Sequence, residues 1–150
     1  SEKKVRVEDK NGVELPSSRI GDKVIVDRGS ENFVFVKFSE DYINDGILGD
    51  VELNESEYEL ASFSSREEIS ERRFSDLIDL YGEDVVGLKE DFNLPNRIDF
   101  GFSLRYSGGG EIGTEDEVPG NVEVFSDFRQ VVVLRDGGES EFGDLVVRIW

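Results

Sequence analysis

The sequence predicts an α+β domain, in which one amphipathic helix at about 66–81 packs on a mostly antiparallel β-sheet. Two observations support this fold class. Short apolar runs of strand type lie before and after a single stretch of helical periodicity, and no βαβ unit repeats along the chain. The length of 150 residues favours one globular domain, with a β-rich N-terminal part at 1–62 and a part at 63–150 that holds the helix and the C-terminal sheet.

The first third of the chain has the composition of short β-strands. A short strand expected at 3–7 leads into Asn11-Gly12, which is a strong hairpin signal. The run at 33–38 is apolar on both faces up to its lysine, which favours a central strand covered on both sides. Further short strands are expected at 23–26 and 47–53.

One segment in the middle of the chain has helical periodicity. Its apolar residues at positions i, i+3, i+4 and i+7 are Phe74, Leu77, Ile78 and Tyr81. Two overlapping capping boxes at 64–68 predict the start of the helix, and Gly82 is placed to end it. We therefore expect a helix at about 66–81, followed by a shorter helical segment at 83–92 that Gly87 disfavours.

The last third of the chain returns to β-structure. Apolar and polar residues alternate strictly at 97–106, which predicts a strand with one face toward the core. A flexible acidic excursion is expected at 107–119. The remaining expected features are strands at 122–125, 131–134 and 145–150, with a bend or bulge near Ser126-Asp127.

Charge and composition exclude several classes of function. The chain has 35 Asp and Glu residues against 17 Lys and Arg, which gives a formal net charge of −18. Such a surface repels phosphate backbones and anionic lipid headgroups, so binding to nucleic acid or to membranes through basic residues is not expected. With no His and no Cys, the chain lacks an imidazole base, a thiol nucleophile and the usual zinc ligands. The sequence therefore predicts no catalytic residue, no cofactor and no enzyme activity.

Three acidic loops are candidate cation sites. They are Asp41–Gly46, Glu115–Glu117 and Glu139–Glu141. None has the spacing of an EF-hand loop with its final bidentate Glu. In a chain with this many carboxylates, such clusters arise readily as turns and solvated surface, so no metal-binding residue is assigned.

The aromatic residues are interpreted mainly as core. Phe33, Phe35, Phe100 and Phe102 are expected to be buried, because a face that stacks on sugars or peptides would favour exposed Trp or Tyr. The final residue, Trp150, has two interpretations that the sequence leaves open. It closes an edge of the core, or it meets a neighbouring subunit.

Three passages in the second half of the chain carry a family resemblance. They are Phe74–Tyr81 with Leu88–Pro95, the strand Ile98–Leu104 with its Asp-Phe-Gly-Phe run, and Phe128–Leu134 with the closing Leu145–Trp150. In these passages the chain resembles the soluble part of archaeal type IV pilin-like secreted proteins, which have a class III signal peptide. The apolar N-terminal helix of that family is not seen here, where the first 60 residues have the pattern of strands. Because the chain contains no Met, we expect its start and any membrane anchor to lie upstream.

The resemblance implies assembly and not chemistry. An upstream apolar helix of about 20 residues would lie in a membrane or a filament core. The present domain would then face outward, at the cell surface or outside the cell, and contact other pilin-like subunits or surface proteins in filament assembly or adhesion. In that setting Asn54, in the acceptor pattern Asn54-Glu55-Ser56, becomes a candidate glycan site. The alternative function is an extracellular module that binds a polysaccharide or a protein, with calcium as an option, and a carboxylate-based glycosidase is a third.

The acidity has two open interpretations. One is a halophilic or extracellular surface that net charge keeps soluble, which suits a chain in which only six of the 17 basic residues are Lys. The other is cation binding by the acidic loops.

Overall fold

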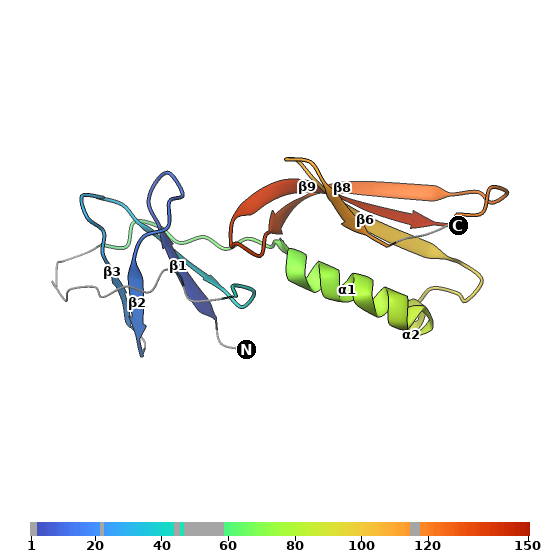
Figure 1. The fold of residues 1–150 in the computed structure, drawn as a ribbon, viewed down its shortest axis with the longest axis horizontal. Coiled ribbons are helices and arrows are strands. Elements are labelled where there is room, and N and C mark those ends of the chain that lie inside the picture. The colour runs from blue at the N-terminus through green and yellow to red at the C-terminus, as the bar shows by residue number, and fades with distance from the viewer. Residues whose placement is uncertain (1–2, 22, 44–45, 47–58, 115–117) are drawn as a thin grey trace. The chain divides into compact units, whose positions relative to one another are not determined.

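The computed structural model describes residues 3–21, 23–43, 46, 59–114 and 118–150. Among these residues 39% lie in strands and 15% in helices, so the fold is mostly β, with two helices (Figure 1). The prediction of an α+β domain built on one helix is therefore wrong, whereas the shorter helical segment expected at 83–92 is confirmed, since residues 85–91 form a second helix. The physical reason is that helical structure is confined to one short stretch, at 71–91, while the described sequence on both sides of it forms strands.

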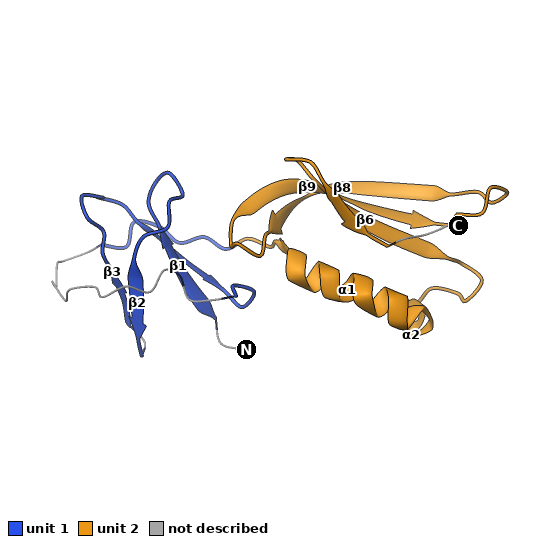
Figure 2. Cartoon of the chain, viewed as in Figure 1, with its two compact units in different colours: residues 1–65 blue, residues 66–150 orange. Residues whose placement is uncertain are grey.

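The chain divides into two compact units, residues 1–65 and residues 66–150 (Figure 2). Each unit has its own paired strands and its own buried side chains. The division falls close to the position at 62–63 where the sequence predicts a change from a β-rich part to a part with a helix. The strand expected at 47–53 lies outside the described residues.

The described part of the N-terminal unit contains two separate antiparallel strand pairs. The strands are β1 (Lys4–Glu8), which pairs with β4 (Phe35–Ser39), and β2 (Ser17–Ile20), which pairs with β3 (Lys23–Val26). Val5 and Val7 of β1 are buried, as expected for alternate residues on one face of a strand.

A tight turn at Asn11-Gly12 follows β1, as the sequence predicts, but the expected hairpin is reduced to an isolated bridge between Glu8 and Glu14, and β1 pairs with β4. Gly12 has a φ of 80°, in the left-handed region that a residue without Cβ adopts at little cost. The Asp9 carboxylate accepts hydrogen bonds from the backbone N–H groups of Val13 and Asn11, each at 2.8 Å. The bond from Val13, and to a smaller extent that from Asn11, lowers the pKa of the Asp9 carboxyl below its usual value. Local polar contacts therefore close this turn.

The apolar run at 33–38 does not form a covered central strand, and that prediction is wrong. Only its last four residues belong to β4, which, among the described residues, pairs with β1 alone in a two-stranded sheet. Phe33 and Phe35 are 66% and 54% exposed, so the expectation that they lie in the core is also wrong. A sheet of two strands leaves one edge of each strand without a neighbour and has too little area to enclose such large side chains.

The C-terminal unit is built on one five-stranded sheet, which both helices accompany. The elements are β5 (Ile69–Ser70), α1 (Glu71–Glu83), α2 (Val85–Asp91), β6 (Phe100–Tyr106), β7 (Glu111–Gly113), β8 (Phe125–Leu134) and β9 (Ser140–Ile149). The strand order is β5-β8-β9-β6-β7. All pairs are antiparallel except β5 with β8, which run parallel, so the sheet is mixed.

Helix α1 begins after the position that the sequence predicts. The capping boxes at 64–68 do not start it, because β5 first pairs with β8. Ser70 then caps α1, and its side-chain oxygen accepts a hydrogen bond from the N–H of Arg73 at 3.4 Å. Asp84 ends α1 and caps α2, where its carboxylate accepts from the N–H of Gly87 at 2.9 Å.

The core of the C-terminal unit combines side chains from the helices and the sheet. Its buried members are Phe74, Leu88, Phe100, Phe102, Leu104 and Val133. The ring of Phe74 meets that of Phe102 edge-on, with centroids 5.5 Å apart, and Tyr81 meets Phe100 in the same way at 5.2 Å. Edge-to-face contacts of this kind stabilise aromatic cores beyond the area they bury. The expectation that Phe100 and Phe102 are core residues is confirmed.

Strands β8 and β9 form a long hairpin. Phe125–Leu134 and Ser140–Ile149 pair in unbroken register over ten residue pairs. The bend or bulge expected near Ser126-Asp127 is wrong, and 131–134 is the end of one continuous strand. The polar residues that suggested a break lie on the exposed part of β8, where they are compatible with pairing to β9.

Candidate interaction surface

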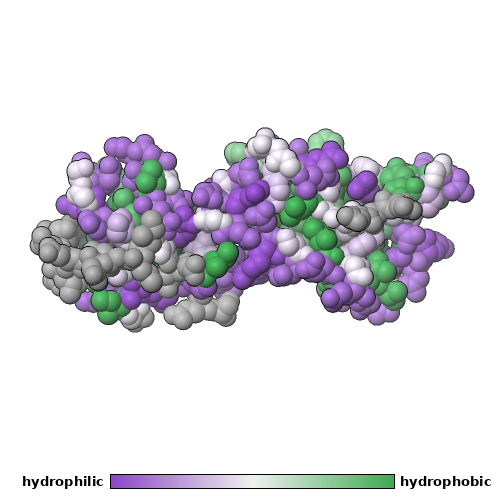
Figure 3. All heavy atoms as spheres, in the orientation of Figure 1, coloured by the Kyte–Doolittle hydropathy of each residue, from purple (hydrophilic) through white to green (hydrophobic). Residues whose placement is uncertain are grey.

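The β8–β9 hairpin exposes large apolar side chains that the core does not use. Phe125, Phe128 and Phe142 are 60%, 74% and 60% exposed, and Val147 is 39% exposed. We call these four side chains the hairpin surface. Figure 3 shows apolar residues as separate groups within a mostly hydrophilic surface. Because exposed apolar groups are unfavourable in water, their concentration on one strand pair marks a candidate site of interaction.

The hairpin surface has two faces, because successive side chains of a strand point to opposite sides of the sheet. Phe125 and Val147 lie on the face that carries the core, which they share with Phe102 across the paired strands. Phe128 and Phe142 lie on the opposite face. A partner therefore reaches both sets of side chains only at the margin of the sheet.

Strand β8 supplies that margin, since it is an edge strand over most of its length. On one side β8 pairs with β9 throughout, and on the other side β5 pairs only with Val133 and Leu134. The first six residues of β8, Phe125–Gln130, are all exposed. Within the described part of the chain, no strand pairs with the outer edge of this stretch. Its outward N–H and C=O groups are therefore open to pairing with another strand.

A polar cluster joins the first turn of α1 to the sheet. The Tyr106 hydroxyl donates to Glu71 Oε1 at 2.7 Å, and Arg135 pairs with Glu71 at 3.2 Å. The Arg135 guanidinium also lies 4.0 Å above the centroid of the Tyr106 ring and pairs with Glu141 at 3.0 Å. Burial, together with the bond to Glu71, raises the pKa of the Tyr106 hydroxyl well above its usual value. These groups are paired with one another, so the cluster holds α1 to the sheet.

Lys89 of α2 is a buried amine, a group that some enzymes use in catalysis. Its ammonium donates to Asp99 Oδ1 at 2.6 Å and to the carbonyl of Asn96 at 3.3 Å. A buried charge is tolerated when it is paired and hydrogen-bonded in this way. Lys89 therefore fixes α2 to the segment that leads into β6.

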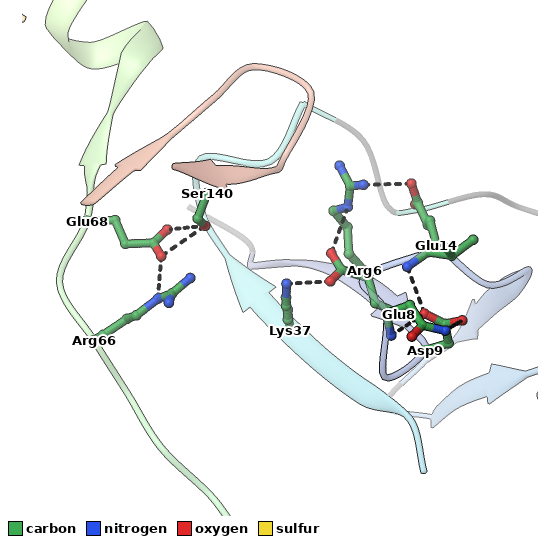
Figure 4. A network of polar contacts seen from close by, with 10 residues as sticks. Arg6, Glu8, Asp9, Glu14, Lys37, Arg66, Glu68 and Ser140 are labelled. Atoms are coloured by element: carbon green, nitrogen blue, oxygen red, sulfur yellow. Dashed lines mark hydrogen bonds and ion pairs between the residues drawn. The ribbon is translucent and has the colours of Figure 1, made fainter. Parts of the chain in front are cut away.

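A second polar network lies in the N-terminal unit, across β1 and β4 (Figure 4). Arg6 pairs with Glu14 at 2.8 Å, and Lys37 pairs with Glu8 at 2.5 Å. Glu8 is buried, and burial of a carboxylate requires such a partner. Two cations balance two carboxylates here, which is the arrangement of a structural network.

The acidic loop Glu139–Glu141 directs its oxygen atoms to protein partners. Glu141 pairs with Arg135, and the Ser140 hydroxyl donates to Glu68 at 3.0 Å (Figure 4). Among the residues that the structure describes, no group of three or more Asp or Glu side chains is placed to hold a metal ion. This loop therefore gives no support for cation binding.

Several residues singled out in the sequence lie outside the described residues. They are Asn44 and Asp45 of the loop Asp41–Gly46, the acidic run Glu115–Glu117 and the candidate glycan site Asn54. Trp150 is described: its N–H donates to the Asp99 carbonyl at 2.9 Å and its carbonyl accepts from the Asp99 N–H at 2.8 Å. The backbone of Trp150 thus continues the pairing of β9 with the strand region around β6.

The hairpin surface is not predicted from the sequence, in which 128–134 carries part of a family resemblance and a break is expected in the strand beside it. The sequence does contain one usable signal: Phe125 and Phe128 are three residues apart, so in one strand their side chains point to opposite faces. When only one face of a sheet has a covering layer, a strand with aromatic residues on both faces can bury only those on the covered face.

No family model, curated protein or solved structure matches the chain. The resemblance to archaeal pilin-like proteins therefore stays a prediction. In the described ranges, no helix has the length and apolar character needed to cross a membrane.

Proposed function

We propose that this chain is a non-enzymatic assembly module, of the kind found in pilin-like subunits, that acts at the cell surface or outside the cell. The contact is made by the hairpin surface. The observation that carries the proposal is the exposure of three phenylalanines, Phe125, Phe128 and Phe142, on one strand pair at an open sheet edge. A protein that covers them removes apolar area from water, which favours association by about 25 cal/mol per Å².

The chemistry of the chain supports assembly over catalysis. The sequence has no His and no Cys. Lys89 and Tyr106, whose side chains are suited to proton transfer, are bonded to Asp99 and Glu71. An assembly module needs only a complementary surface, and the hairpin surface provides one without any reacting group.

The charge of the chain is compatible with a partner that contacts β8. A net charge of −18 keeps separate copies apart in solution and opposes non-specific association. Along the exposed part of β8, however, the charged residues are one acid and one base, Asp127 and Arg129. The exposed part of β8 therefore carries no net charge, although the chain as a whole is strongly acidic.

Photo-crosslinking in the cells that make the protein tests the proposal. A photoreactive phenylalanine analogue replaces Phe142 in one variant and Phe128 in another. We expect each to form a discrete protein adduct on irradiation, because both side chains lie in the proposed contact. The matched control places the same analogue at Val86, which is 55% exposed on α2. A lack of adducts at Phe142 and Phe128, or equal adducts at Val86, would contradict the proposed function.

A further inference from the structure

The open edge of β8 has a self-complementary sequence. Residues 125–131 read Phe-Ser-Asp-Phe-Arg-Gln-Val. In an antiparallel pair, two opposed residues both direct their backbone groups toward the partner strand or both direct them away. A two-fold axis that relates two copies of one strand must therefore place one residue opposite its own counterpart, and each register is named by that residue.

An axis at Phe128 matches every residue of this segment with a suitable partner. Phe128 then opposes Phe128 of the second copy, and Asp127 opposes Arg129 in both directions. Ser126 opposes Gln130, and Phe125 opposes Val131. Opposite charges, aromatic pairs and pairs of an aromatic with a β-branched residue are the combinations that stabilise antiparallel strands.

Neighbouring positions of the axis do not give this match. An axis at Asp127 opposes Asp127 to itself and Arg129 to Phe125. An axis at Arg129 opposes Arg129 to itself and Asp127 to Val131. Like charges directly opposite each other destabilise a strand pair, so the sequence selects the register centred on Phe128.

The structure leaves the required backbone and side chains accessible. The pairing of β8 with β9 is unbroken, so the outer edge is a regular strand without a bulge to block addition. Asp127 and Arg129 lie on the same face, 3.7 Å apart, with side chains 75% and 79% exposed. Strand β5 occupies the outer edge only from Val133 onward, two residues past the segment at 125–131.

We infer that the partner bound at the hairpin surface is a second copy of this chain, paired antiparallel through residues 125–131 of β8 about a two-fold axis at Phe128. This inference rests on the proposed function, in which the hairpin surface binds a protein. Pairing joins the two sheets into one across β8, and it buries Phe128 against its counterpart.

Charge inversion with rescue tests the pairing on the full chain. Sedimentation velocity measures the association from about 10 µM to about 1 mM protein. The buffer contains about 0.15 M NaCl, at which the Debye length is about 8 Å, so the repulsion between distant acids is screened while contacts between adjacent side chains remain. The native chain should form a species of twice 16.9 kDa. Arg129→Asp places two acids opposite each other twice, and Asp127→Arg does the same with two bases. Each single variant should weaken the dimer by about tenfold or more.

Two combinations should restore association. The double variant Asp127→Arg/Arg129→Asp is again self-complementary, and an equimolar mixture of the two single variants should form a heterodimer. The matched control is Arg97→Asp, which makes the same charge change at an exposed residue before β6 and should leave dimerisation unchanged. Circular dichroism establishes that each variant is folded. Hydrogen exchange tests the pairing without any mutation. In the native chain, the backbone amides at 125–131 should exchange more slowly as the protein concentration rises.

Each outcome decides between the two proposals. A native chain that stays monomeric to about 1 mM, or a dimer that single inversions leave unchanged, overturns self-pairing. If the chain is monomeric but the analogue at Phe142 captures a different protein, self-pairing fails and the proposed function stands. If the chain is monomeric and no adduct forms, both fail.

Discussion

The hydroxyl of Tyr106 shows how much of this fold depends on single polar contacts. It joins β6 to the first residue of α1 through Glu71, and Glu71 also accepts a hydrogen bond from the backbone N–H of Asp136 at 3.1 Å. One carboxylate therefore connects a helix, a central strand and the turn after β8. Arg135 covers the same ring and supplies the opposite charge.

Replacement of Tyr106 by Phe is expected to lower the free energy of unfolding by about 1–2 kcal/mol at neutral pH, since it removes a hydrogen bond to a charged group. The effect should depend on pH. The pKa of Tyr106 is raised in the folded chain, so its contribution is present below the unfolded value of about 10 and is lost as pH rises through the folded value. Urea denaturation of both proteins, at neutral pH and at successive pH values above about 10, measures the difference.

Alkaline absorbance titration provides the control for this prediction. In the native chain Tyr106 should ionise only well above a pH of about 10, and the Tyr106→Phe variant should lack that late step. A stability difference that stays constant as pH rises, or a late step that survives in the variant, would show that the Glu71 bond does not hold the hydroxyl in its protonated form.

At the scale of elements, the apolar side chains on one face of α1 pack against the sheet. Phe74 is buried and meets Phe102 edge-on, whereas Leu80 on the same helix is 42% exposed. Phe74→Ala is expected to lower the free energy of unfolding by about 3–5 kcal/mol, through lost burial and the cavity left behind. The matched change Leu80→Ala should cost under about 1 kcal/mol. Equal effects of the two substitutions, measured by urea denaturation, would contradict the packing of α1 on the sheet.

The sequence predicts best those elements that depend on residues close together in the chain. The spacing of Phe74, Leu77, Ile78 and Tyr81 is local, and these residues do form a helix that packs on the core. The start of α1 is not local, because it depends on the pairing of β5 with the distant strand β8. The same holds for the continuity of β8, where β9 supplies hydrogen-bond partners along residues that look like a break.

Strand burial shows the same division. The run at 33–38 and the strand Phe100–Tyr106 are both apolar, yet only the second is buried at its phenylalanines. The difference comes from neighbouring strands: β6 lies between β9 and β7 and beside the helices, whereas in the described part of its unit β4 pairs with β1 alone. The number of strands beside a segment is a property of topology that composition does not contain.

At the scale of the whole molecule, net charge is the dominant feature. Charges that sum to −18 repel one another in the compact state, and added salt screens that repulsion. We therefore expect the Tm to rise from low salt to about 1 M NaCl, where the Debye length falls to about 3 Å. Calorimetry in NaCl and in an equal concentration of a neutral osmolyte separates screening from general solvent effects. A Tm that falls with NaCl would show that paired contacts such as Arg6 with Glu14 outweigh the net repulsion.

The chain also folds as two units, each with its own strand pairs. The change of character near 62 is visible in the sequence, since strand-like runs give way to helical periodicity there. The proposed contact of the hairpin surface belongs entirely to the unit at 66–150.

Four features of this protein can be read from its sequence: the acidity, the absence of imidazole and thiol chemistry, the turn at Asn11-Gly12 and the residues of the helical face. These follow from composition and from interactions between residues close in the chain. Which apolar residues are covered, where α1 starts and which strand is left at an edge depend instead on the tertiary structure. Those properties arise from pairing between distant segments, and the candidate interaction surface is one of them: Phe125 and Phe128 are exposed because β8 has β9 on one side and, among the described residues, only two residues of β5 on the other.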